Sequence, residues 1–158
     1  MTTMDSTAAA DREIVLSREY DAPRQLVWRA YTDPEHVPHW WGPDGFHNTV
    51  HEIDVRPGGR WRFTMHGPDG TEYPNRITYR EIVAPERIEF LHGEDVDDDP
   101  GAFQVTVTFE DLGAIRTRVT QRMLFNTRAQ RDGALQYGAE ELGQQTLAKL
   151  AEHLKTME

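Results

Sequence analysis

Two pairs of histidines have the spacing closest to that of a metal site. His36 and His39 are three residues apart and His47 and His51 are four apart, separations at which histidines can bind one zinc ion. The second pair lies in a segment with strand periodicity, where residues four apart are separated by about 13 Å, too far to share an ion. We therefore predict no metal site, with the histidines at the surface or at the edge of the core.

The other polar motifs do not match a known catalytic or cofactor-binding pattern. The acidic run from Asp95 to Asp99 resembles a calcium loop only in its charge, because it lacks the glycine and the distal glutamate of an EF-hand. The Gly-Pro-Asp-Gly stretches at 42–45 and 67–70 are typical of turns, since a phosphate-binding loop would open a helix. No nucleophile elbow is present. We predict no catalytic residue and no cofactor.

The first forty residues predict a strand followed by two short helices. Residues 14–20 mix β-branched and polar residues and end at a turn. Pro23 suits the first turn of a helix, where its missing N–H costs nothing. Asp33, followed by a proline, begins a second short helix that ends at the adjacent Trp40 and Trp41. Neighbouring residues cannot share one face of a helix, so this pair raises the question of where two indoles are buried.

The rest of the chain predicts a sheet and one long helix. From 47 to 125 apolar and polar residues alternate between short turns, which indicates about six or seven strands in one antiparallel meander. Residues 127–157 are free of proline and predict a helix that must lie across the concave face of the curved sheet. Its apolar stripe consists of Leu135, Tyr137, Gly138, Leu142, Thr146, Leu147, Leu150 and Leu154.

Composition limits the classes of protein and partner. The 158 residues suffice for one domain, which we place at 13–158 after a flexible tail at 1–12 that lacks the features of a secretory signal. The net charge of −10 disfavours nucleic acid and anionic lipid as partners. No stretch approaches the ~18 apolar residues of a membrane span, so we expect no membrane insertion. The absence of cysteine fits a cytoplasmic location.

Several motifs resemble one family in their order and spacing, over about residues 13 to 155. They are Ala22-Pro23, Val27-Trp28, Trp40-Trp41-Gly42-Pro43, Arg56-Pro-Gly-Gly-Arg60-Trp61, Gly67-Pro-Asp-Gly70, Pro85-Glu-Arg-Ile88 and Leu147-x-x-Leu150-x-x-x-Leu154. The chain resembles the stand-alone bacterial proteins similar to the C-terminal domain of the activator of the heat-shock-protein-90 ATPase, in the START-like, birch-pollen-allergen-like (SRPBCC) superfamily.

This resemblance implies an α+β helix-grip fold, in which a curved antiparallel sheet grips the long helix around an internal cavity. Members of the superfamily bind lipids, sterols and polyketides there, and some catalyse cyclisation or dehydration. By the same likeness, one indole of the tryptophan pair points inward and the other covers the junction before the first meander strand. One departure is Leu142-Gly143, where many relatives have the bulky and the small residue in the opposite order.

The resemblance turns the inward-facing apolar residues into candidates for a ligand-binding cavity, although their periodicity fits a filled core equally well. The predicted ligand-binding residues are Trp40, Trp41, Trp61, Phe63, Met65, Tyr79, Phe90, Val107, Val119 and Tyr137. Polar groups in an apolar pocket orient its ligand. The polar residues expected to face the cavity are Glu52, Tyr79, Gln121 and Glu141.

We therefore predict a non-enzymatic, cytoplasmic binder of a small, largely apolar molecule. One alternative is a cochaperone that stimulates a heat-shock-protein-90-type ATPase, although the eukaryotic activator has an additional N-terminal domain for which this chain offers only a short tail. Another alternative is an enzyme of the cyclase or hydratase type, with Glu52 or Glu141 as its acid/base group. A chaperone partner and a homodimer stay open.

Overall fold

A computed structural model describes residues 11–113 and 115–157. The predicted tail at 1–12 lies outside the described residues except for Asp11 and Arg12. The described strands are β1 (Glu13–Tyr20), β2 (His47–Ile53), β3 (Arg60–His66), β4 (Glu72–Val83), β5 (Arg87–Glu94), β6 (Phe103–Asp111) and β7 (Thr117–Leu124). The described helices are α2 (Arg24–Thr32), α3 (Val37–Trp40), α4 (Arg128–Gln136) and α5 (Ala139–Met157).

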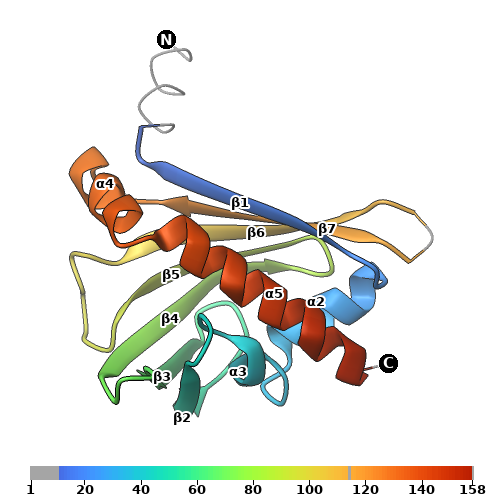
Figure 1. Cartoon of the computed structure of the whole chain (residues 1–158), viewed down its shortest axis with the longest axis horizontal. Helices are drawn as coiled ribbons and strands as arrows, with labels where there is room; N and C mark the ends of the chain where they lie inside the picture. The colour runs from blue at the N-terminus through green and yellow to red at the C-terminus, as the bar shows by residue number, and fades with distance from the viewer. Residues whose placement is uncertain (1–10, 114, 158) are drawn as a thin grey trace.

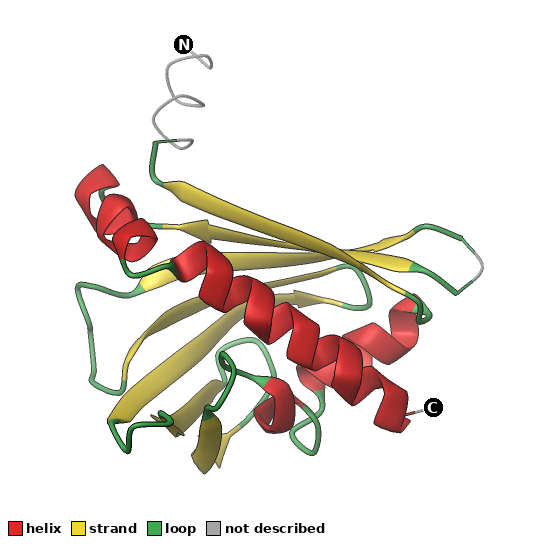
Figure 2. Cartoon of the chain, viewed as in Figure 1, coloured by secondary structure: helices red, strands yellow, loops and turns green. Residues whose placement is uncertain are grey.

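The strands form one antiparallel sheet in the order β1-β7-β6-β5-β4-β3-β2, so every neighbouring pair except β1 and β7 is a hairpin. Helix α5 crosses the sheet diagonally, with α2 and α3 beside its C-terminal half (Figure 1). Helices α5, α2 and α3 thus cover the apolar face of the sheet (Figure 2). The helix-grip α+β fold is confirmed. Among the described helices, none is long and apolar enough to cross a membrane.

The C-terminal segment is two helices rather than the single helix that we predicted. Helix α4 ends at Gln136 and α5 begins at Ala139, with Gly138 between them at a φ of +82°. Glycine adopts this left-handed conformation without steric cost and commonly ends helices in this way. The break removes Leu135 and Tyr137 from the stripe that packs on the sheet, and both side chains are exposed.

A β-bulge in β2 places Glu52 on the face opposite to the one that we predicted. Alternation from Val50 would place Glu52 on the inner face, but the register of β2 against β3 shifts between these two residues. An extra residue at a bulge reverses which face the following side chains occupy. Glu52 therefore lies opposite Arg62 on the outer face, while Ile53 lies opposite the buried Trp61.

The close packing of α5 on β1 depends on Gly143. A Cβ atom at this position would lie 2.2 Å from Cδ1 of Leu16, which is itself buried in the core. The exchanged order Leu142-Gly143 thus has a local reason: the small residue is the one that faces β1, and Leu142 is partly exposed.

Candidate functional site

Both tryptophans of the adjacent pair are buried, because α3 ends between them. Trp40 is the last residue of α3 and is 1% exposed, whereas Trp41 has an extended backbone and is 9% exposed. Trp40 Nε1 donates a hydrogen bond to the carbonyl oxygen of Ala30 in α2 (3.0 Å). Trp41 instead contacts the sheet, with its ring centroid 5.5 Å from that of Trp61 and 6.2 Å from that of Phe90.

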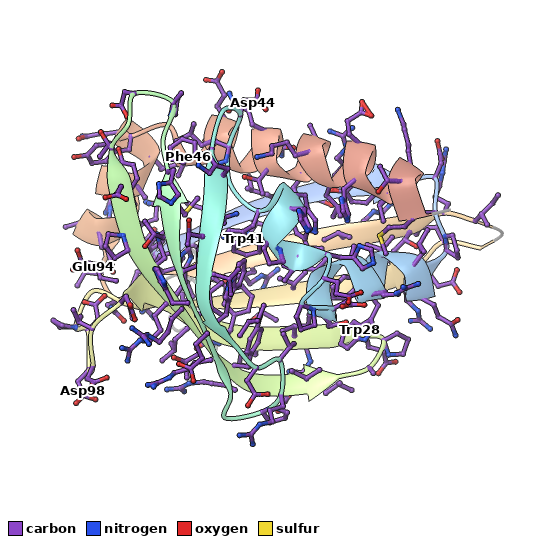
Figure 3. The ribbon with its side chains drawn as sticks, turned by 90° about the horizontal axis from the view of Figure 1, so that it is seen from below. Trp28, Trp41, Asp44, Phe46, Glu94 and Asp98 are labelled. Carbon is purple, nitrogen blue, oxygen red and sulfur yellow. The ribbon has the colours of Figure 1, made fainter. Side chains whose placement is uncertain are left out.

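We expected one indole to point inward and the other to cover the junction before the first meander strand; both are buried, and Asn48 at the start of β2 donates a hydrogen bond to the Trp41 carbonyl oxygen. The change from helical to extended backbone at Trp41 directs one ring toward α2 and the other toward the strands. Figure 3 shows Trp41 beside α3, in the middle of the molecule.

Most of the predicted ligand-binding residues are tightly packed. Trp61 stacks on Phe63 with 4.0 Å between the ring centroids, and both are fully buried. The other buried members of the predicted set are Trp40, Trp41, Tyr79, Phe90, Val107 and Val119. Met65 is partly buried. Tyr137 does not lie between sheet and helix, because it is 85% exposed at the break before α5.

Another set of inward-facing residues is only partly buried. Gln121 lies directly opposite Leu16 and Val107, both buried, yet Gln121 itself is only half-buried. His92 is likewise half-buried although it lies opposite the buried Ile77. The half-buried residues of the inner face that we call the open part are Met65, Asn75, His92, Phe103 and Gln121.

His92 is the deepest polar group of the open part. Desolvation by burial lowers the pKa of His92 to about 4, so its imidazole is neutral at pH 7. Asn75 Nδ2 donates to the carbonyl oxygen of Tyr73, which leaves Asn75 Oδ1 to accept a hydrogen bond from His92 Nε2 (2.9 Å). His92 Nδ1 is then an acceptor. His92 is thus a neutral polar group on the inner face that is strongly desolvated and still partly exposed.

Another polar group inside the molecule, unlike His92, lacks a partner. Trp61 is fully buried, and its Nε1 has no hydrogen-bond acceptor among the described residues. A buried donor without a partner costs about 1–3 kcal/mol, so such groups usually meet water or a ligand. The indole N–H adds a donor to the interior beside Trp41 and Phe63.

The loop after the tryptophan pair is held against α5. Lys149 Nζ donates to the carbonyl oxygens of Pro43 and Phe46, each at 3.2 Å, and Asp44 N donates to Gln145 Oε1. Desolvation lowers the pKa of Lys149, and the nearby Asp44 carboxylate opposes that shift. Figure 3 shows Asp44 and Phe46 near α5, away from the edge that carries Glu94 and Asp98.

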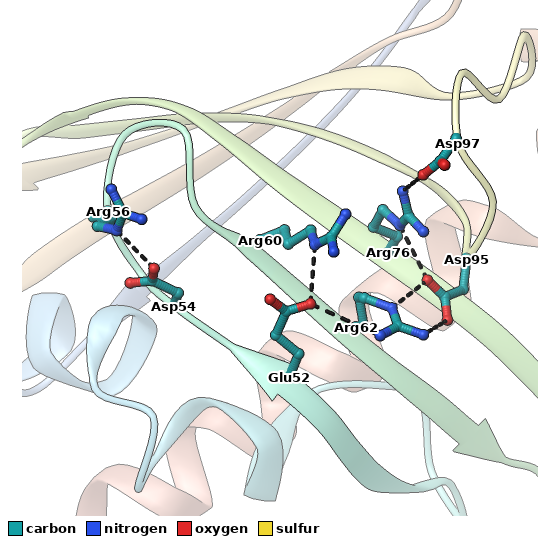
Figure 4. Close-up of polar contacts among 8 residues, drawn as sticks. All are labelled: Glu52, Asp54, Arg56, Arg60, Arg62, Arg76, Asp95 and Asp97. Atoms are coloured by element: carbon teal, nitrogen blue, oxygen red, sulfur yellow. Dashed lines mark hydrogen bonds and ion pairs between the residues drawn. The ribbon is translucent and has the colours of Figure 1, made fainter.

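The outer face of the sheet carries a charged network beside a hollow of about 490 Å³. Arg62 and Arg76 both donate to Asp95 through Nε, at 2.9 and 3.0 Å, and Arg76 also donates to Asp97 (Figure 4). The pKa of Asp95 is lowered, and the hydrogen bond from Arg62 is the largest cause. Asp95 and Asp97 of the predicted acidic loop thus pair with arginines, whereas Asp99 accepts hydrogen bonds from the backbone N–H groups of Glu94 and Gly101. None of the predicted ligand-binding residues lines this hollow.

Neither carboxylate proposed for acid/base catalysis faces the interior. Glu52 accepts a hydrogen bond from Arg60 Nε (2.9 Å) on the outer face (Figure 4), and Glu141 is exposed on α5. Gln121 is the member of the predicted polar set that the register places inward and half-buried. Sequence reasoning missed His92 and Asn75 as site residues, although the alternation of Ile88, Phe90 and His92 gave the signal for an inward histidine.

A curved antiparallel sheet that grips a long C-terminal helix defines a START-like helix-grip protein. The chain belongs to the family of activator of Hsp90 ATPase homolog 1-like proteins, whose model matches residues 21–155. No curated protein matches the chain.

Solved structures agree with this family. A protein from Arthrobacter aurescens is 27% identical, with a TM-score of 0.85 over 94% of this chain and 88% of its own. A protein from Nitrosomonas europaea is also 27% identical, with a TM-score of 0.81 over 94% of this chain and 97% of its own. A protein from Mycobacterium smegmatis is 25% identical, with a TM-score of 0.83 over 95% of each chain.

Proposed function

We propose that the chain is a cytoplasmic, non-enzymatic binder of a small, largely apolar molecule held between the sheet and α5. The observation that carries the proposal is Gln121. Its side-chain amide points to the inner face among buried apolar residues, is half-buried, and has no hydrogen-bond partner in the described part of the chain. A polar group in such surroundings without a protein partner is suited to orient a bound molecule.

The chemistry of the open part favours an uncharged ligand. Its polar groups are the amides of Gln121 and Asn75 and the neutral imidazole of His92, and the Trp61 N–H lies nearby. A charged ligand would lose its hydration without meeting an opposite charge, which costs several kcal/mol. We therefore infer a neutral, apolar molecule with one or two hydrogen-bonding groups, bound among Met65, Phe103 and the packed aromatic residues of the predicted set.

The test is binding of a neutral apolar fluorescent probe, N-phenyl-1-naphthylamine, to the parent protein and to two tryptophan variants. The parent should bind the probe and gain about 2.7 kcal/mol of stability when the free probe is at a hundred times its Kd. Gln121→Trp should fold with little loss of stability, because the indole occupies the open space, but should no longer bind. Fluorescence titration and urea unfolding measure the two effects.

Arg122→Trp is the matched control, since Arg122 is the next residue of β7 and lies on the outer face in an ion pair with Glu13. This variant should bind the probe like the parent. If Gln121→Trp is destabilised by roughly 1–3 kcal/mol, as overpacking of a filled core would be, and the parent binds no probe, the proposal is wrong.

The family's name supports a second candidate function, a cochaperone of a heat-shock-protein-90-type ATPase. If the chain has this function, it should accelerate ATP turnover by such a chaperone whether or not the Gln121→Trp substitution fills the inner face. Gln121→Trp separates the two candidates, because it removes ligand binding and leaves the outer surface unchanged. A homodimer remains compatible with either function.

A further inference from the structure

Three histidines from distant parts of the chain meet where α3 lies against α5. His36 precedes α3 and His39 lies within it, while His153 is near the C-terminal end of α5. Nδ1 of His36 and Nε2 of His153 are 3.0 Å apart, and the ring of His39 stacks on that of His153 with 6.1 Å between centroids. His36 and His153 are half-buried and His39 is exposed, so the cluster can be reached from solvent. The sequence pair His36 and His39 alone did not predict the third member.

We propose that His36, His39 and His153 form a binding site for a divalent transition-metal ion, for which Zn²⁺ is the natural probe. Imidazole nitrogen is a preferred ligand of zinc, nickel and copper. No described group of three or more metal-binding side chains is already arranged for coordination. The metal-bound form therefore requires a rotation of His39 and a rearrangement of the hydrogen-bonded pair His36 and His153.

The geometry of the first two ligands is close to that of a metal site. Two imidazoles on one tetrahedral zinc ion, with Zn–N distances of about 2.05 Å, hold their nitrogens roughly 3.3 Å apart. The nitrogens of His36 and His153 are 3.0 Å apart; once the donor imidazole shifts its proton to its other ring nitrogen and both rings turn so that their lone pairs converge, the two nitrogens can bind one ion. His39 is one turn from His36 on the same side, and its imidazole has no hydrogen-bond partner in the described residues. Its ring is free to rotate toward the ion.

The cationic side chains that flank the cluster on α5 have partners of their own. A metal ion binds the neutral form of imidazole, so zinc binding should weaken as the pH falls. Lys149, one turn earlier on α5, is engaged by the carbonyl groups of Pro43 and Phe46, and Lys155 pairs with Glu152.

A metal ion at this cluster would join α3 to α5 and so fix the corner that carries Trp40 and Trp41. Because the ion binds this arrangement in the folded protein and not in the unfolded chain, the free energy of unfolding would increase with metal concentration. The inference does not depend on the proposed ligand between sheet and helix, since the three histidines lie outside the open part.

The experiment is titration of the chelator-treated full chain with Zn²⁺ at pH 7.5, followed by calorimetry and thermal unfolding. The expected result is one ion per chain and a higher unfolding temperature. His36→Gln and His153→Gln should each weaken binding by at least roughly tenfold, because even the indirect partners of metal ligands contribute about 10- to 100-fold. A double variant, His47→Gln with His66→Gln, is the control.

His47 and His66 stack face to face at 4.6 Å on β2 and β3, so they form the other close pair of histidines. Their replacement should leave zinc binding unchanged. The proposal is overturned if the parent binds no zinc, or if binding is lost only in the His47/His66 variant. Should His153→Gln fail to fold, the imidazole NMR signals of the parent decide: zinc must shift those of His36 and His153 and leave those of His47 in place.

Discussion

Replacement of Trp40 by alanine should lower the free energy of unfolding by about 3–5 kcal/mol, the range for a large aromatic residue removed from a core. Trp40 is 1% exposed, and its ring packs edge-on against Tyr31 with 4.7 Å between centroids. The change also removes the hydrogen bond that Trp40 Nε1 donates to Ala30. Such a loss is a large part of the total stability of a domain, about 5–15 kcal/mol. Urea unfolding followed by circular dichroism measures it.

Trp28→Ala is the matched control for the loss of an indole. Trp28 lies on α2 and is only partly buried against Phe109, so its replacement should cost clearly less. Trp41→Ala should fall near the range of Trp40→Ala, because Trp41 is also buried. Negligible losses at both Trp40 and Trp41 would mean that the pair does not anchor the helical corner to the core.

Acidification from pH 6.5 to pH 4 should cost at most about 3 kcal/mol of stability through His92 alone. The pKa of His92 is lowered from 6.5 to about 4 by burial, so the folded protein holds the imidazole neutral while the unfolded chain takes up a proton. The stabilisation is complete above pH 6.5 and is lost as the pH falls to about 4, at 1.36 kcal/mol per unit. The partial exposure of His92 makes this value an upper bound.

His92→Gln tests this origin, since glutamine keeps a donor for Asn75 but does not titrate. The slope of unfolding free energy against pH should decrease in this variant between pH 6.5 and pH 4. The difference in slope between the variant and the parent gives the contribution of His92, separate from that of other groups such as His153. An exposed histidine on β2, His51, provides the control His51→Gln. An unchanged slope in His92→Gln would contradict a desolvated, neutral imidazole at the inner face.

The sequence predicted the elements well because their signals are local. Alternation along 47–125 predicted the meander, and the proline after Ala22 predicted the start of α2. It also placed Gln121 inward correctly, since β7 has no bulge in its pairing with β1 or β6. The prediction failed where one residue interrupts the period of a strand or helix. The bulge after Val50 places Glu52 on the outer face, and the helix break at Gly138 leaves Tyr137 away from the sheet.

The site was less predictable because it depends on contacts between distant residues. Strand periodicity assigns Trp61, Phe63 and Phe90 to the inner face but cannot tell a packed face from an open one. Whether the face is packed or open depends on how closely α5 approaches the sheet. At β1 the helix comes close because Gly143 has no side chain to collide with Leu16. The contact of His36 with His153 spans 117 positions and has no local signal at all.

The central claim, that a small apolar molecule binds at the open part of the inner face, is tested most directly by NMR of the protein titrated with the neutral probe. The side-chain signals of Gln121, Asn75 and His92 should shift in a saturable way, while those of Arg122 and of Arg60 and Arg76 beside the outer hollow should not. Shifts confined to the outer hollow, or no saturable shift at the inner face, would contradict the account.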